Sequence, residues 1–282
     1  MSFCSLKHAC SCFLKLWLFI AVLQVSPVHA HSDLHERIVA LTKQLQITPH
    51  DPSLLFKRAE LNRQHHDWNA ALADYDQVEK LDADFPAVDF GRGRTLYESG
   101  QAAEALAALD RYLIGNPKHI RALLTRARAR VLLARYQDAI ADYDKVIFFS
   151  NRPLPEYYIE RAESWAALGE KFHHKAIKGL DEGLSTLGPV FTLQYAAIDL
   201  EVKSRQYANT LKRIDALPAS IKNTSTWQQK RGDILLLAGD AQKAQAAFDF
   251  ALAKIHKLPE TRRKVKAVAE LEKQLLTRLK NN

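Results

Sequence analysis

The feature that most constrains the fold of this chain is an internal repeat with a period of about 34 residues, a length typical of helical repeat arrays. The segment Ala71–Val78 recurs as Ala139–Val146 with six of eight residues identical, and a related copy, Ala105–Tyr112, lies midway between them. An arginine followed by a small residue keeps nearly the same period, at Arg58, Arg92, Arg126 and Arg161. Such a period indicates a solenoid, in which each structural unit packs mainly against its neighbours.

Each unit has the pattern of a helix, a turn and a second helix. In the third copy, Ala139, Ile140, Tyr143, Val146 and Ile147 lie on one face at helical spacing. Turns between paired helices are expected at Gly100, Gly169 and Gly239. Prolines mark helix starts, or the loops before them, at Pro52, Pro86, Pro117, Pro155, Pro189 and Pro259. With only 10 Gly and 10 Pro among 282 residues, and with many Ala, Leu, Glu, Lys and Arg, the chain is predicted to be all-α.

On these residues the chain resembles the tetratricopeptide-repeat family, whose repeated helix pair has small side chains at repeat positions 8 and 20 and a bulky one at position 24. Counted from Pro52, Pro86 and Ile120, position 8 holds Ala59, Gly93 and Ala127, position 20 holds Ala71, Ala105 and Ala139, and position 24 holds Tyr75, Leu109 and Tyr143. The resemblance implies an α-solenoid of five to six units with capping helices at both ends. At position 7, where the family commonly has leucine, this chain has arginine, and we expect its stem to pack while its head stays in water.

We expect a signal peptide over 1–30, a leading helix over 31–51, a solenoid over 52–258 and a C-terminal capping helix over 259–282. The solenoid is predicted to consist of units 52–85, 86–119, 120–154, 155–188, 189–224 and 225–258. Unit 189–224 is degenerate, because Lys212 and Asp215 stand where apolar residues are expected. The leading helix itself is expected over His35–Gln46, and the closing helix over Glu260–Lys280.

The segment 1–30 has the layout of a secretory signal. Lys7 and Lys15 come first, an apolar run over 16–25 follows, and Val28 and Ala30 supply small residues before a cleavage site. The apolar run is too short to span a bilayer, which takes about 20 residues. We therefore predict export, to the periplasm of a Gram-negative bacterium or otherwise by secretion, with a retained anchor as the alternative. Cleavage after Ala30 removes all 3 cysteines and lowers the net charge from +8 to +6, because two lysines are lost.

The sequence contains none of the motifs that would indicate catalysis. It has no phosphate-binding loop and no nucleophile elbow, and no cysteine nucleophile remains after export. The histidine pairs His65–His66 and His173–His174 fall near turns of separate repeats, whereas a zinc site needs three or four converging ligands. We therefore predict no enzymatic activity, no metal and no cofactor. Because the positive charges are spread along the chain, we also predict no nucleic-acid partner.

The family resemblance further implies a concave groove lined by side chains of the first helix of each repeat, at positions 2, 5, 6, 9, 12 and 13. Position 9 changes sign along the chain, from Glu60 to Arg94 and Arg128 and back to Glu163. The predicted groove residues are Lys57, Glu60, Arg63, Phe90, Arg94, Tyr97, Arg121, Leu124, Arg128, Glu160 and Glu163.

Two interpretations of this groove remain open at the level of sequence. In one, Arg94 and Arg128 pair with Glu60 and Glu163 in an internal ladder of exposed ion pairs, each contributing about 0–1 kcal/mol. In the other, Arg94, Arg121 and Arg128 bind the carboxylates of an acidic or C-terminal peptide. We predict an exported scaffold that binds a protein or peptide within a cell-envelope or secretion assembly. A structural spacer, or a ligand-binding or accessory subunit of an envelope enzyme complex, is the alternative.

Overall fold

The computed structural model describes residues 27–281, where the chain forms α-helices, one short 3-10 helix and no strand. The first helices of the successive pairs are α2 (Pro52–Gln64), α4 (Val88–Glu98), α6 (Ile120–Leu132), α8 (Pro155–Ala167), α10 (Phe191–Lys203) and α13 (Ser225–Leu237). The second helices are α3 (Trp68–Leu81), α5 (Ala102–Gly115), α7 (Tyr136–Phe149), α9 (His173–Leu187), α11 (Tyr207–Asp215) and α14 (Ala241–His256). The remaining elements are α1 (Pro27–Ile47), η1 (Glu170–Phe172), α12 (Ala219–Lys222), α15 (Glu260–Arg263) and α16 (Lys266–Asn281).

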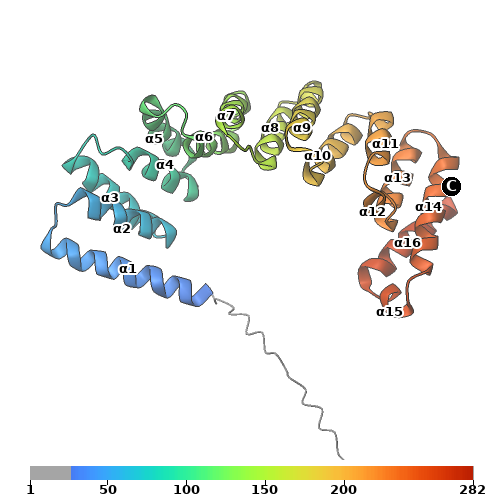
Figure 1. The fold of residues 1–282 in the computed structure, drawn as a ribbon, viewed down its shortest axis with the longest axis horizontal. Helices are drawn as coiled ribbons and strands as arrows, with labels where there is room; N and C mark the ends of the chain where they lie inside the picture. The colour runs from blue at the N-terminus through green and yellow to red at the C-terminus, as the bar shows by residue number, and fades with distance from the viewer. Residues whose placement is uncertain (1–26, 282) are drawn as a thin grey trace, which may run out of the picture.

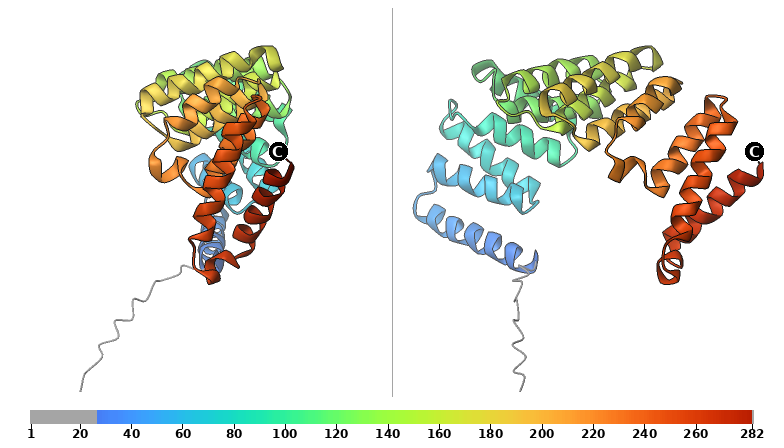
Figure 2. Two further views of the ribbon diagram at one scale, coloured as in Figure 1. Left: turned by 90° about the vertical axis from the view of Figure 1, so that its right-hand side faces the viewer. Right: turned by 45° about the vertical axis from the view of Figure 1, so that its right-hand side comes forward.

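The helix pairs follow one another along an arch (Figure 1). Each first helix packs against the second helix of its own pair and against the second helix of the preceding pair. Helices α4, α6, α8 and α10 lie along the inner side of the arch, and α5, α7 and α9 lie along its outer side (Figure 1). Helix α1 and the C-terminal helices form its two ends (Figure 2). The predicted all-α solenoid is confirmed.

Small residues allow the paired helices to approach closely. The side chains at repeat positions 8 and 20 are fully buried, including Ala59, Ala71 and Ala139 at 0% exposure. A Cβ atom placed on Gly232 of α13 would lie 2.3 Å from Cε1 of Phe248 on α14, so this contact requires glycine. A bulkier side chain at any of these positions would separate the two helices, because protein interiors have little free volume.

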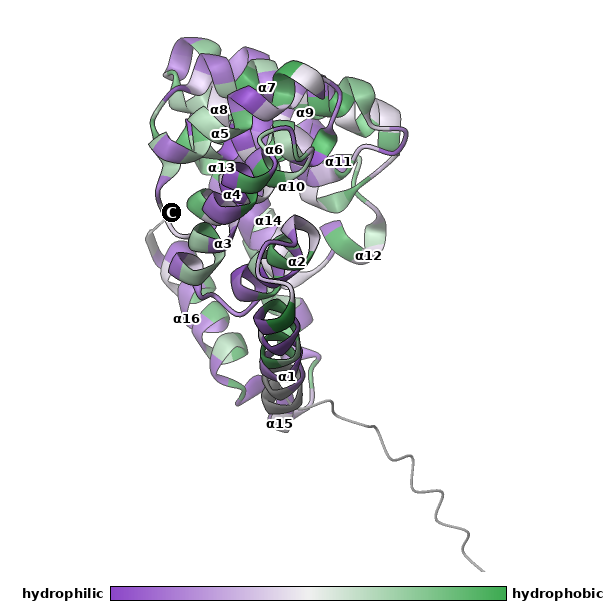
Figure 3. Ribbon diagram, turned by 90° about the vertical axis from the view of Figure 1, so that its left-hand side faces the viewer, coloured by the Kyte–Doolittle hydropathy of each residue, from purple (hydrophilic) through white to green (hydrophobic). Residues whose placement is uncertain are grey.

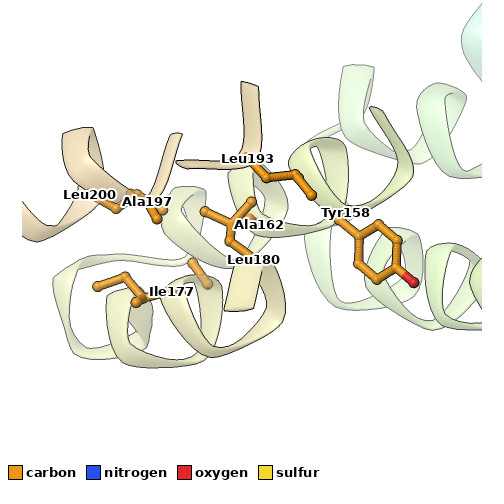
Figure 4. Close-up of a cluster of buried hydrophobic side chains, with 8 residues drawn as sticks. Tyr158, Ala162, Ile177, Leu180, Leu193, Ala197 and Leu200 are labelled. Atoms are coloured by element: carbon orange, nitrogen blue, oxygen red, sulfur yellow. The ribbon is translucent and has the colours of Figure 1, made fainter. Parts of the chain in front are cut away.

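The core is a series of clusters, each shared between neighbouring helices. In the central cluster, Tyr158 and Ala162 of α8 meet Leu180 of α9 and Leu193 and Ala197 of α10 (Figure 4). Similar clusters join α1 to α4 and α13 to α16. Stability therefore depends on contacts between adjacent repeats, as the one-dimensional architecture of a solenoid requires.

Each turn between paired helices contains a residue with a positive φ angle. Gly100, Gly169 and Gly239 have positive φ angles of 86°, 111° and 83°. The same place in the other pairs is occupied by His66, Ala134 and Arg205, with φ of 63°, 55° and 57°. Left-handed backbone is unfavourable for residues with a Cβ, so these three turns are more strained than the glycine turns. Arg205 extends this turn into the repeat that the sequence showed as degenerate.

The degenerate repeat buries a different set of residues from the one expected. Lys212 and Asp215 are exposed, while Thr210, Ile214 and Leu217 are buried. Counted from the start of α10 at Phe191, and not from Pro189, repeat positions 20 and 24 fall on Thr210 and Ile214, so this repeat keeps the consensus register two residues later than expected. Hydrophobic packing is thus retained without apolar residues at 212 and 215.

The two terminal helices differ from their predicted bounds. Helix α1 spans Pro27–Ile47, which is longer than the expected helix over His35–Gln46. The predicted closing helix over 260–280 is wrong as a single element, because it is divided into α15 and α16 at 264–265.

The predicted signal lies outside the described residues except at 27–30. Hydrophilic and hydrophobic residues are mixed along the helices, including the coloured part of α1 (Figure 3). In residues 27–281 no helix is both long and apolar enough to cross a bilayer.

Candidate functional site

Two adjoining pockets lie on the first helices of the middle repeats, around α8. The first, of about 420 Å³, is lined by Tyr97, Arg128, Val131, Leu132, Tyr136, Tyr143, Glu160, Glu163, Ser164 and Ala167. The second, of about 560 Å³, is lined by Ile159, Ala162, Glu163, Ala166, Ala167, Leu180, Thr192, Tyr195, Ala196, Asp199, Leu200 and Lys203. Because Glu163 and Ala167 line both pockets, the two pockets meet across α8, and together they are called the α8 groove.

A separate pocket of about 430 Å³ lies between α1 and α2 and includes Lys57 and Glu60. The structure thus distributes the predicted groove residues over two places. Lys57 and Glu60 line the pocket near α1, while Tyr97, Arg128, Glu160 and Glu163 line the α8 groove. Of the other predicted residues, Arg63 and Arg94 contact Glu60, Phe90 and Leu124 pack against a hydrophobic cluster, and Arg121 is exposed.

Glu60 is at the centre of the first cluster of charged groups. It accepts a hydrogen bond of 2.6 Å from the Tyr75 hydroxyl. Its Oε2 atom lies 3.3 Å from Nη2 of Arg63 and 3.6 Å from Nη1 of Arg94. Arg63 also donates to both carboxylate oxygens of Glu98, at 2.7 and 3.0 Å. Burial, reinforced by the charge of Glu60, raises the pKa of Tyr75, so its hydroxyl stays a donor.

Glu160 is at the centre of the second cluster. Arg128 donates to it through Nε and Nη2 at 2.9 and 2.6 Å, and the Tyr143 hydroxyl donates at 2.9 Å. The sequence-based pairing of Arg128 with Glu163 is therefore wrong: its partner is Glu160, almost one helical turn earlier on α8. This paired, forked geometry is the stronger form of the arginine–carboxylate interaction.

Glu163 differs from both of these carboxylates. It is exposed, and within residues 27–281 no hydrogen bond or ion pair ties it to another side chain. Partial desolvation, together with the nearby charge of Glu160, outweighs the opposing charge of Lys203 and raises the pKa of the Glu163 carboxyl above its usual value. Its position at the junction of the two pockets leaves this carboxylate available to a ligand.

The remaining predicted residues have other surroundings. Phe90 stacks on Tyr112 with ring centroids 5.2 Å apart, and the guanidinium of Arg94 lies over its ring. Leu124 packs against the core, whereas Arg121 is exposed at the start of α6. Phe90 and Leu124 therefore stabilise the fold and line neither pocket.

Sequence reasoning missed a ladder of arginine–carboxylate contacts, here called the arginine ladder. Its members at repeat position 7 are Arg58, Arg92, Arg126 and Arg161. Arg126 donates through Nε and Nη2 to Asp142 of its own repeat, at 2.8 and 2.7 Å, and lies 2.7 Å from Asp110 of the preceding repeat. The expectation that these arginine heads stay in water is wrong. The signal was present in the sequence, because Asp110 and Asp142 lie at equal separations before and after Arg126.

The described part of the chain offers no group of three or more His, Cys, Asp or Glu side chains that would hold a metal ion. The histidine pairs point to separate partners: His66 packs edge-on against Trp68, and Nδ1 of His173 is 3.0 Å from the Ser204 hydroxyl. What the α8 groove provides is a partly apolar surface with one available carboxylate.

A family model described as tetratricopeptide repeat matches residues 62–128. A tetratricopeptide-repeat protein from Parabacteroides merdae superposes with a TM-score of 0.53 at 19% identity, covering 89% of this chain and 95% of its own. The C-terminal part of a TPR repeat-containing protein from Cytophaga hutchinsonii reaches a TM-score of 0.62 at 14% identity, covering 85% of this chain and 97% of its own. Residues 62–128 thus match the tetratricopeptide-repeat family, and the described chain has the fold of tetratricopeptide-repeat solenoids.

Two other solved structures have a similar fold. MamA from Desulfovibrio magneticus has a TM-score of 0.51 at 16% identity, covering 58% of this chain and 92% of its own. A structure of Naa15/Naa10 bound to HypK-THB has a TM-score of 0.54 at 14% identity, covering 89% of this chain and 39% of its own. A comparison with curated proteins finds no match. The tetratricopeptide-repeat fold supports a protein-interaction scaffold and is typical of non-catalytic modules.

Proposed function

We propose that this tetratricopeptide-repeat protein is a scaffold that holds a segment of another protein in its α8 groove and catalyses no reaction. The observation that carries the proposal is the α8 groove itself. Its two pockets have apolar walls that the chain's own side chains leave unfilled, and large side chains such as Leu132 and Tyr195 stand 62% and 48% exposed at its rim. Concave, mostly apolar surfaces with a few polar groups are the usual sites of ligand binding.

The ion pairs of Arg94 and Arg128 limit which side chains of the chain can bind a partner. Arg94 lies 3.6 Å from Glu60, and Arg128 donates to Glu160 through Nε and Nη2, so the charge of each guanidinium is already paired within the chain. This favours the internal-ladder interpretation for these two arginines over a site for an acidic peptide. The Naa15/Naa10 neighbour, bound to HypK-THB, is a precedent for this fold in a protein complex.

Site-specific photo-crosslinking tests the proposal. A photoreactive amino acid is introduced at Leu132 or Tyr195 in the groove, and at the exposed Lys178 on the outer helix α9 as the matched control. After irradiation in cells, we expect a discrete protein adduct from the two groove positions and none from Lys178. Equal labelling at all three positions, or labelling at Lys178 alone, would refute a groove function.

The location of the protein is part of the same proposal. The signal layout of residues 1–30 supports export into the periplasm, where the scaffold would serve a cell-envelope or secretion assembly. The experiment is N-terminal sequencing of the protein from a fractionated cell. A mature chain beginning at His31 in the periplasmic fraction is the expected result. An intact Met1 in the membrane fraction would instead indicate a retained anchor.

A further inference from the structure

The lining of the α8 groove has more negatively charged side chains than positively charged ones. Its lining, as the described residues form it, includes the acids Glu160, Glu163 and Asp199 but only two permanent cations, Arg128 and Lys203. The net charge of the lining is therefore −1, in a chain whose formal net charge is +8. A local acidic surface on a basic protein is a feature of the site and does not follow from the overall composition.

Both cations are already neutralised within the groove. Arg128 makes its two-pronged interaction with Glu160, and Nζ of Lys203 lies 2.7 Å from Asp199, one turn earlier on the same helix. Glu163 has neither a hydrogen bond nor an ion pair with any neighbour in the part of the chain that the structure describes. The unmatched charge of the groove is thus located on one carboxylate, at the junction of the two pockets.

The walls beside Glu163 have little bulk. Ala162, Ala166 and Ala167 are its neighbours on α8, and Ala196 faces the same pocket from α10. Small side chains leave room for a long side chain to lie along the pocket, and a lysine or arginine stem packs well on apolar surface while its charged head reaches a carboxylate. The partly desolvated state of Glu163, seen in its raised pKa, increases the gain from a cationic partner.

The aromatic rim gives the second half of the recognition surface. Tyr195 forms a cluster with Phe191 and Trp227, with ring centroids 6.0 to 6.3 Å apart. Nζ of Lys230 lies 4.2 Å from the centre of the Tyr195 ring, so a cation of the chain itself already occupies the α13 side of this cluster. The available cation-binding position is therefore the one at Glu163, and the rim on the α10 side contributes apolar contact.

From this arrangement we propose that the α8 groove selects a protein segment in which a lysine or arginine stands beside an apolar side chain. The basic group pairs with Glu163, and the apolar group packs between Ala166 and Tyr195. The inference rests on the proposed scaffold function and reverses the charge of the partner expected from the sequence, where Arg94, Arg121 and Arg128 pointed to an acidic peptide.

The test uses the full-length protein, immobilised and exposed to a phage-displayed library of random dodecapeptides. Bound peptides from the unaltered protein should be enriched in Lys and Arg relative to Asp and Glu. Replacing Glu163 with glutamine should reduce this enrichment about fivefold, since one partly exposed ion pair is lost, and E163R should reverse it. The matched control is Glu104→Gln, because Glu104 is an exposed carboxylate of α5 that lies outside the groove.

The outcomes separate this inference from the function on which it rests. Selection of peptides without a basic preference, or a preference unchanged in E163Q, would overturn the charge assignment. In that case adducts from Leu132 and Tyr195 would still support a protein-binding groove. A preference for acidic peptides would restore the arginine-based interpretation, and circular dichroism of each variant verifies that the helical fold is intact.

Discussion

Replacing Asp142 with alanine should destabilise the solenoid more than any other single change to a charged residue of the arginine ladder. Asp142 is 1% exposed and accepts hydrogen bonds from Nε and Nη2 of Arg126 and from Nη1 of Arg130, at 2.8, 2.7 and 2.5 Å. The two arginine side chains are only 12% and 14% exposed. Removing the carboxylate leaves two largely buried cations without their main partner.

The expected cost follows from that burial. Loss of one member of a buried ion pair typically costs about 3–5 kcal/mol, and the slight exposure of both arginines places this change near about 3 kcal/mol. At a urea dependence of about 3 kcal/mol per molar, the unfolding midpoint should fall by about 1 M. Urea titration followed by circular dichroism at 222 nm measures this shift directly.

A matched control is available on the same arginine. Asp110 also contacts Arg126, at 2.7 Å, but is 52% exposed, so Asp110→Ala should cost at most about 1 kcal/mol. A double-mutant cycle with Arg126→Leu isolates the coupling between Arg126 and Asp142. If Asp142→Ala is no more destabilising than Asp110→Ala, the burial of the carboxylate does not determine how much these contacts stabilise the fold.

Three further predictions concern packing, turn strain and pH. Gly232→Ala should destabilise by about 1–3 kcal/mol in thermal melts, because the new Cβ would overlap the ring of Phe248; an unchanged midpoint would contradict this helix contact. Ala134→Gly should stabilise by about 1 kcal/mol or less, because it relieves a positive φ of 55°, and a loss of stability would refute turn strain. Burial raises the pKa of Tyr75 and Tyr143 above the ordinary value of 10.0, so the unfolded chain loses these protons first, and stability should fall as pH rises through 10. Absorbance at 295 nm should show both phenols ionising only with unfolding; earlier ionisation would contradict their burial.

The solenoid was predictable from sequence because its signal is periodic. Ala59, Ala71 and Ala139 recur at fixed positions since two helix axes can approach closely only over a small side chain. The register of α11 was not predictable in the same way. Thr210 and Ile214 are buried at positions 20 and 24 of a repeat that begins at Phe191, whereas Pro189 indicated a start two residues earlier.

The groove was harder to predict from the sequence. The spacing of residues along the repeat does not determine which carboxylate an arginine will contact, because that depends on side-chain geometry. Position 9 pointed to Glu163 as the partner of Arg128, but the guanidinium reaches Glu160 at position 6, where the Tyr143 hydroxyl also donates. That choice leaves Glu163 without a partner among the described residues. A pairing error of almost one helical turn thus changes the expected partner of the groove from acidic to basic.

The arginine ladder also bears on how such a chain tolerates gain or loss of whole units. Arg126 takes one carboxylate from its own repeat and one, Asp110, from the repeat before it. Asp76 stands one full repeat period before Asp110 and already contacts Arg92. Deletion of 86–119 would therefore bring Asp76 to the place of Asp110 beside Arg126, whereas deletion of half a unit would leave an arginine facing the wrong helix. Contacts of this kind make the repeat unit an interchangeable part, and they favour changes in array length by whole repeats.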